Sequence, residues 1–352
     1  MKKIILISIL SMLSGMLYSQ EEGKVKETQD KKVEFTFMPY VSYNRNLEFM
    51  FGLVPMVMYK VNQEDKLSPK SLSGAAAVYT TNGSFFVVAF SRWYFKEDQW
   101  RLQSYFGTGD HNSQFFMSDE YSAGFYDFAT KSTFFNVGVK RKVSKKLYVG
   151  LSFSYFDFET DYYGVTDATS SKTFALEPNL LSDTRDNVYY PTSGYLGKFR
   201  WQTYQTWLGN DEQANRVFVD YNKYWPLHKG NDVLATRVAG SFGLGDIGFE
   251  QQEVLGGKDI RGYTEGKYRG DGLLSLQGEY RLNFADRMGV TGFLGLATIY
   301  GSDTEDFNWD IYPGIGVGYR YKAFKDSPFT VGVDGALGKD DWGVYFRIGE
   351  AF

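Results

Sequence analysis

The last third of the chain carries the run Val254-Leu255-Gly256-Gly257-Lys258-Asp259-Ile260-Arg261-Gly262-Tyr263. This run lies in a glycine-rich segment, residues 240–272, between stretches that alternate apolar and polar side chains. A long connection without its own periodic pattern is usually a functional loop or a disordered segment. Glycines also allow one backbone to approach another closely. We therefore interpret the run as a loop that folds back into the lumen of a β-barrel, with Arg261 at its tip.

The stretches on both sides of this loop have the two-residue period of β-strands. In residues 147–155 large apolar side chains occupy every second position, and residues 272–284 and 311–322 alternate in the same way. Their polar positions hold Gln, Glu, Arg, Lys and Gly. Apolar side chains on one face and charged ones on the other suit a barrel with lipid outside and water inside. A soluble β-sandwich also alternates, so a soluble sandwich or β-solenoid is the alternative.

This period predicts fifteen strands between residues 47 and 352, and residues 33–43 are the candidate for a sixteenth. An even number is expected of single-chain bacterial barrels, although Pro39 fits only an edge or bulge position. Five predicted strands follow the loop, which places it between strands 11 and 12: residues 272–284, 288–300, 311–322, 328–338 and 342–352. We expect an all-β, transmembrane antiparallel barrel of about 16 strands, whose last strand pairs with its first because lipid offers exposed backbone no partner.

The N-terminal residues predict the destination of the chain. Met1-Lys2-Lys3 and an apolar run to Leu17 have the order of a secretory signal peptide, with cleavage expected after Ser19. A membrane anchor is the alternative, but the run is shorter than the roughly 20 apolar residues that a spanning helix needs. Residues 20–32 are uniformly polar and predict a flexible periplasmic leader. The barrel then occupies residues 33–352.

Composition excludes several classes of protein. The chain has no Cys, so it has neither a disulfide framework nor a cysteine nucleophile. A net charge of −4 gives no indication of nucleic-acid binding. No run of 18 apolar residues follows the N-terminal one, which excludes a polytopic helical membrane protein. His111-Asn112-Ser113 suggests a hydrolase, but no oxyanion donor is identifiable. We predict no catalytic residue, metal site or cofactor.

Three motifs occur in order along the chain: Asp183-Thr184-Arg185-Asp186 with Pro191-Thr192-Ser193-Gly194, then Gly256-Gly257 with Ile260-Arg261-Gly262-Tyr263, then Gly278-Glu279-Tyr280-Arg281. They resemble the strand–turn motif, the lumen-loop motif and the following strand of the bacterial surface antigen superfamily of outer-membrane barrels. BamA, TamA and the two-partner-secretion transporters belong to this superfamily. The resemblance covers about residues 46–352. The terminal Phe352 also resembles the C-terminal signal by which such barrels are inserted.

The resemblance implies a function at the outer membrane of a Gram-negative bacterium, in contact with its lipid. The chain is expected to assist insertion or translocation of polypeptides through a weakly paired seam between first and last strands. Most relatives carry periplasmic POTRA modules, for which residues 20–32 are too short, so the resemblance implies a barrel without them. A separate periplasmic partner, the assembly machinery and unfolded barrel substrates are the expected partners. The alternatives are a passive pore with a plug loop and a structural or accessory barrel subunit.

The residues themselves predict one ion pair and one capped turn. An arginine inside a barrel must be paired, and Glu279 falls on the inward face of the next strand. The family supplies a second acid from an F-x-D pattern, but Phe293-Leu294-Gly295 places glycine there, which leaves Arg261 with one carboxylate. Around Pro191 and Gly194, the side chains of Asp183, Arg185 and Asp186 predict a strand end that caps its own backbone rather than a catalytic site.

Overall fold

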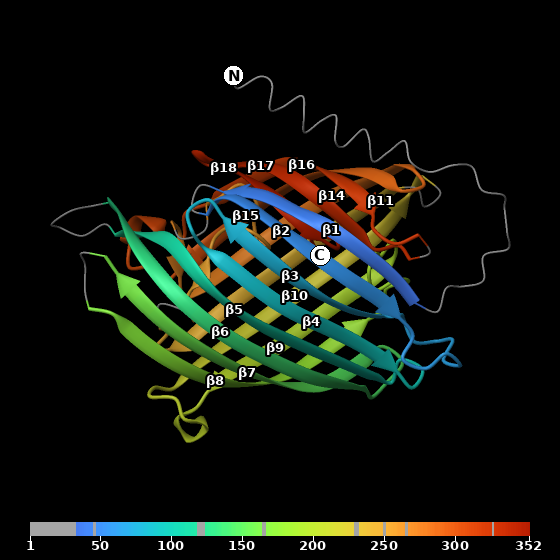
Figure 1. The fold of residues 1–352 in the computed structure, drawn as a ribbon, viewed down its shortest axis with the longest axis horizontal. Helices are drawn as coiled ribbons and strands as arrows, with labels where there is room; N and C mark the ends of the chain where they lie inside the picture. Colours follow the sequence, from blue (N-terminus) through green and yellow to red (C-terminus); the bar gives the residue numbers. More distant parts are fainter. Residues whose placement is uncertain are drawn as a thin grey trace. The chain divides into compact units, whose positions relative to one another are not determined.

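The chain is described by a computed structural model over residues 33–44, 47–117, 124–163, 167–228, 232–248, 251–264, 267–325 and 327–352. In these residues sixteen antiparallel strands, β1–β11 and β14–β18, close into one barrel (Figure 1). The first eight strands are β1 (Val33–Asn44), β2 (Glu48–Tyr59), β3 (Ser71–Thr80), β4 (Phe85–Phe95), β5 (Trp100–Met117), β6 (Gly124–Lys142), β7 (Leu147–Tyr162) and β8 (Thr169–Asp183). The remaining eight are β9 (Gly194–Tyr204), β10 (Ala214–Leu227), β11 (Asp232–Gly245), β14 (Gly272–Ala285), β15 (Met288–Tyr300), β16 (Tyr312–Lys322), β17 (Thr330–Gly338) and β18 (Asp341–Ile348).

The predicted strand number is confirmed, and residues 33–43 do form the first strand, β1. It pairs along its whole length with β2. Pro39 sits in β1 opposite Leu53 of β2, and β1 lies at the closure of the barrel, where a missing N–H costs the least sheet pairing.

Burial along the strands is reversed relative to a water-soluble sheet. In β14 the polar side chains Ser275, Gln277 and Glu279 are buried, whereas Leu276 and Tyr280 are 53% and 38% exposed. Polar groups therefore line the inner face of the closed barrel and apolar groups cover its outer face, the arrangement of a transmembrane barrel. A sandwich, whose apolar faces pack on each other, is excluded.

β11 pairs directly with β14, so residues 246–271 form a long connection between the eleventh and twelfth barrel strands. We call this connection the Arg261 loop. It contains a short two-stranded sheet of β12 (Glu253–Val254) and β13 (Arg269–Gly270). Five barrel strands follow it, as predicted.

One predicted boundary was wrong: the last predicted strand, 342–352, ends at Ile348. Gly349 then adopts φ +84° and donates its N–H to the Thr330 carbonyl at 2.7 Å, which turns the chain out of the sheet.

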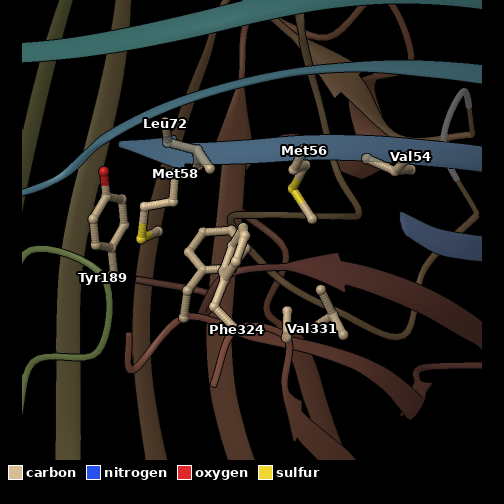
Figure 2. Close-up of a cluster of buried hydrophobic side chains, with 9 residues drawn as sticks. Val54, Met56, Met58, Leu72, Tyr189, Phe324 and Val331 are labelled. Atoms are coloured by element: carbon tan, nitrogen blue, oxygen red, sulfur yellow. The ribbon is translucent and has the colours of Figure 1, made fainter. Parts of the chain in front are cut away.

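A buried apolar cluster packs β2 and β3 against the β16–β17 connection (Figure 2). Met56 and Met58 of β2 point toward Phe324, and Tyr189, from the turn between β8 and β9, contributes its ring. The cluster comprises Val54, Met56, Met58, Leu72, Tyr189, Ala323, Phe324, Phe329 and Val331. Since β1 and β18 lie between these two groups of strands in the barrel order, the cluster joins both sides of the barrel closure.

Residues 1–32, with the predicted signal peptide and leader, lie outside the described residues. No helix within the described ranges is long and apolar enough to cross a membrane.

Candidate functional site

Arg261 of the Arg261 loop is buried among side chains of the strands that follow the loop. Its guanidinium donates to Glu279 Oε2 of β14 at 2.8 Å and to Asp334 Oδ2 of β17 at 2.7 Å. It also stacks on the Phe293 ring of β15, with Cζ 3.3 Å from the ring centroid. Arg261 is 1% exposed, and both carboxylates are fully buried. The predicted partner Glu279 is therefore in place.

The expectation that Arg261 has a single carboxylate was wrong. Asp334 supplies the second acid from β17, two strands beyond the position where the family pattern places it. Gly295, which stands at that position, instead lies against the loop, since a Cβ there would meet Ile260 Cδ1 at 2.8 Å. The glycine makes room for the Ile260 side chain, and the charge comes from another strand.

Three further arginines complete a network around the two acids. Arg281 donates to Glu279 at 2.8 Å, Arg320 forms a salt bridge with Asp334, and Arg347 donates to Asp334 at 3.1 Å. A third carboxylate, Glu350, lies 3.1 Å from Arg320 and 3.6 Å from Arg281. Each buried charge has an opposite charge within reach, which offsets part of the desolvation cost of the cluster. Arg320, Arg347 and Glu350 were not identified from the sequence, although strand alternation places Arg320 on the polar face.

Hydrogen bonds also fasten the loop residues after Arg261 to β16 and β18, in addition to the contact of Arg261 with β17. The N–H groups of Gly262 and Tyr263 donate to the Tyr345 hydroxyl at 2.9 and 3.2 Å. The Tyr263 hydroxyl donates to the Pro313 carbonyl at 2.6 Å. Thr264 donates its N–H to Asp341 at 2.6 Å. The loop tip is thus held by β16, β17 and β18 together.

Glycines at the contact allow this close approach. Gly262 has φ +110°, and a Cβ there would meet the Leu337 carbonyl carbon at 2.5 Å. Opposite the loop, a Cβ at Gly338 would meet the Gly262 carbonyl oxygen at 2.5 Å, and one at Gly314 would meet the Arg261 carbonyl oxygen. Gly256 and Gly257 also have positive φ, +130° and +60°, where larger residues are strained.

The strand–turn motif caps its own backbone, as the sequence predicts. Arg185 donates from Nε to Asp183 at 2.9 Å and from Nη1 to the Val188 carbonyl at 3.0 Å. Asp186 accepts the N–H groups of Thr192 and Ser193 at 2.9 and 3.1 Å. Pro191 is buried, and Gly194 turns the chain with φ +92°. The motif also positions Tyr189 in the apolar cluster of Figure 2.

The junction of β1 and β18, here called the seam, has the fewest residue pairs in register of any barrel junction in the described residues. Within the described residues these strands share one register pair, Tyr43 with Val344, whereas every other pair of neighbouring barrel strands shares six or more. Side chains supplement the pair: Ser42 donates to the Val344 carbonyl at 2.8 Å, and the rings of Tyr43 and Trp342 stack at 5.2 Å. Most of β1 thus has a sheet partner on one side only.

The four residues after β18 fold onto the inner face and do not extend the seam. Glu350 joins the arginine network, and the Phe352 carbonyl accepts a hydrogen bond from Arg281 at 2.8 Å. The Phe352 ring packs on a buried cluster that includes Tyr148, Leu196 and Tyr224. The signal role predicted for Phe352 stays a prediction, but its side chain has a packing role in the barrel.

The fold is shared with solved structures of BamA and CdiB. BamA from Haemophilus ducreyi lacking POTRA domains 1-3 superposes with a TM-score of 0.56 at 15% identity, over 97% of this chain and 77% of that chain. CdiB from Acinetobacter baumannii gives 0.61 at 13% identity, over 91% and 60%, and CdiB from Escherichia coli gives 0.64 at 10%, over 93% and 63%. The chain therefore spans less than two thirds of either CdiB chain. At these identities the likeness shows the fold.

No curated protein matches the chain at a significant level. The Omp85 superfamily domain matches residues 70–352, which cover most of the sequence and include the strand–turn motif, the Arg261 loop and all five strands that follow it. The predicted resemblance to BamA-type barrels is confirmed, and the chain belongs to the Omp85 superfamily.

Proposed function

We propose that this chain is an outer-membrane barrel that assists insertion or translocation of polypeptides at its seam. The observation that carries the proposal is the single register pair between β1 and β18. Residues 33–42 of β1 pair with β2 and have no register partner on β18 among the described residues. Such an edge is a template for an incoming strand, which can add to it by backbone hydrogen bonding.

The seam is suited to this role because lipid raises the cost of unpaired backbone. Each backbone group without a partner in the hydrocarbon region costs several kcal/mol, so an edge there favours any strand that can pair with it. The side chains beside the edge are apolar and exposed, with Phe35 82% and Phe37 63% exposed. An incoming strand would meet the β1 edge next to a surface compatible with lipid.

We infer that the Arg261 loop occupies the lumen and stabilises the strands on one side of the seam. Its contacts with Asp334, Tyr345 and Asp341 fix it to β17 and β18 on their inner faces. The other side of the seam, β1 and β2, can then move against a wall that the loop holds in place. Outer-membrane lipid and a separate periplasmic partner belong to this proposal, and the role requires no enzymatic chemistry.

A disulfide across the seam tests the proposal. The chain has no Cys, so Tyr43→Cys/Val344→Cys introduces the sole pair, at positions that face each other in the register. In proteoliposomes the oxidised variant should fail to accelerate the folding of a urea-denatured eight-stranded barrel, and reductant should restore the acceleration. The matched control is Ile315→Cys/Leu337→Cys, which joins β16 to β17 within a continuous ladder. It should work when oxidised. Full activity of the seam-locked protein would refute a role for seam opening.

A further inference from the structure

The inner face of β4 to β10 surrounds a second feature, a cavity of about 550 Å³ that the proposed function does not use. This volume lies within the range of small-molecule sites. Seven of its lining residues are cationic and two are acidic, Glu177 and Asp220. The lining side chains occupy strand positions opposite the exposed apolar ones, such as Lys198 and Arg200 beside Phe199, which is 41% exposed. The cavity is therefore bounded by the inside of the barrel.

Four of the seven cations are neutralised by acids. Arg101 and Arg185 share Asp183, with Arg101 also paired to Asp98. Arg200 lies 3.0 Å from Glu177, and Lys258 of the Arg261 loop lies 3.6 Å from Asp220. In the network of β14–β18, arginines are likewise paired with buried acids. They hold the wall together and leave little charge for a ligand.

The remaining three cations, Arg92, Lys140 and Lys198, form no salt bridge within the described residues. Arg92 donates to the Tyr105 hydroxyl at 3.0 Å, and Lys140 donates to Gln103 Oε1 at 3.3 Å. Both of these acceptors are neutral. The three residues come from β4, β6 and β9 and line one cavity. Charges of one sign that line a common cavity attract a counter-ion.

We propose that this cavity is a binding site for a small, water-soluble, multivalent oxyanion of the phosphate class. A multivalent ligand matches three separate cations better than a single carboxylate does. Lys and Arg both donate charge-assisted hydrogen bonds to phosphate oxygens. Asn136 and Gln202 also line the space and provide neutral amide donors. A lipid headgroup is disfavoured because the cations lie on the inner face.

Inorganic pyrophosphate is the probe that tests the site. Titration calorimetry on the full chain in non-ionic detergent micelles should show saturable binding that weakens as sodium chloride is raised, because salt screens the attraction. Lys140→Gln/Lys198→Gln should weaken binding by about tenfold or more, since it removes two charge-assisted contacts. Lys172→Gln/Lys325→Gln removes the same charge from exposed positions and should bind like the wild type.

Several results would overturn the proposal: no saturable binding by the wild type, equal affinity in Lys140→Gln/Lys198→Gln, or equal weakening in the surface control. Tighter binding of dihexanoyl phosphatidic acid than of pyrophosphate would overturn the assignment to a soluble ligand. Heat-modifiable migration on gels verifies that each variant is folded. A folded Arg92→Gln variant provides an independent test if the double variant fails to assemble, and it too should bind pyrophosphate more weakly. This site and the seam are tested separately, because neither seam cysteine lines the cavity.

Discussion

The buried guanidinium of Arg261 fixes the position of the loop tip. Its planar guanidinium reaches carboxylates on β14 and β17, so its position is fixed against two walls rather than one. Each acid is also shared with another arginine: Glu279 with Arg281, and Asp334 with Arg320. Loss of one acid would leave several buried positive charges underpaired, a change that typically costs 3–5 kcal/mol.

Gly262 allows a direct test of this location. Gly262→Ala places a methyl group at φ +110° and about 2.5 Å from the Leu337 carbonyl carbon, so the loop tip cannot stay in contact with β17. We expect trypsin to cleave the variant at Lys258 or Arg261 while the wild type resists. Gly278→Ala is the matched control, because a Cβ there meets no atom within 4 Å. Equal resistance of Gly262→Ala and the wild type would show that the contact does not hold the loop.

The sequence predicts only the local half of this site. Glu279 follows Arg261 by 18 residues on the next strand, so alternation alone identifies it as a partner. Asp334 is 73 residues from Arg261, and the sequence shows only that it faces the lumen. Its proximity to Arg261 depends on the registers of the three strand pairs from β14 to β17. Each register has to be predicted in turn, and the errors add up along the sheet. The same reason explains why Arg347 and Glu350 were not identified.

Among the elements, the seam combines a weak ladder with strong side-chain packing. β1 and β18 share one register pair, yet the apolar cluster of Figure 2 joins β2 and β3 to the β16–β17 connection. Glu34 of β1 adds polar links, to Lys70 at 2.8 Å and from Ser327 at 2.9 Å. The cluster therefore lies beside the part of β1 that has no register partner on β18, since Met58 and Val54 of β2 pair with Glu34 and Met38.

The turn at residues 96–98 shows how a neighbouring loop stabilises an unusual backbone. Lys96, Glu97 and Asp98 all have φ between 53° and 58°, a strained region for residues with side chains. The β2–β3 link supports them: Asp65 accepts the Glu97 N–H at 2.9 Å, and the Ser68 hydroxyl accepts the Asp98 N–H at 2.7 Å. Burial raises the pKa of the Asp65 carboxyl, but hydrogen bonds from Ser68, Glu97 and Leu67 outweigh it and lower the pKa to about 2.

This lowered pKa predicts a loss of stability in acid. The unfolded carboxyl has a pKa of about 3.9, so its ionised form stabilises the fold above about pH 4, and the contribution is lost as pH falls toward about 2. Solvent screening limits the effect to roughly 1 kcal/mol. We expect the free energy of unfolding, measured in urea and detergent, to fall more steeply in the wild type than in Asp65→Asn over this range. Parallel curves would contradict this role for Asp65.

For the whole molecule, the sequence predicts the architecture better than the charge distribution. Alternation, strand count and the position of the loop follow from local patterns, because the side-chain period of a strand is fixed by its geometry. Local patterns do not show which inward-facing charged residues share one cavity. Arg92, Lys140 and Lys198 belong to three strands and line one cavity only when the barrel is closed. The arginines of β14–β18 are instead paired with acids on those strands and in the C-terminal residues. The inward-facing charges thus divide into three cations without a salt bridge in the cavity of β4–β10 and arginines paired with acids on β14–β18.

This division predicts the effect of removing the loop. Replacing residues 251–264 with a short Gly-Ser linker deletes Ile260, Arg261 and Tyr263, all buried against the strands. Glu279 and Asp334 keep their ion pairs with Arg281, Arg320 and Arg347, so the barrel should still assemble. If the loop occupies the lumen, single-channel conductance in planar bilayers should rise. The reversal potential should favour anions, because the cavity cations then face an open path.

The same variant separates the two main functions considered for this chain. A passive pore with a plug needs the loop only as a barrier, so deletion of the loop would raise conductance and have no other effect. An insertion factor needs the loop to hold β17 and β18 in place beside the seam, so deletion should also reduce the acceleration of barrel folding in proteoliposomes. Wild-type conductance in the deletion variant would place the loop outside the permeation path. High conductance with undiminished folding assistance would show that the loop does not support the seam.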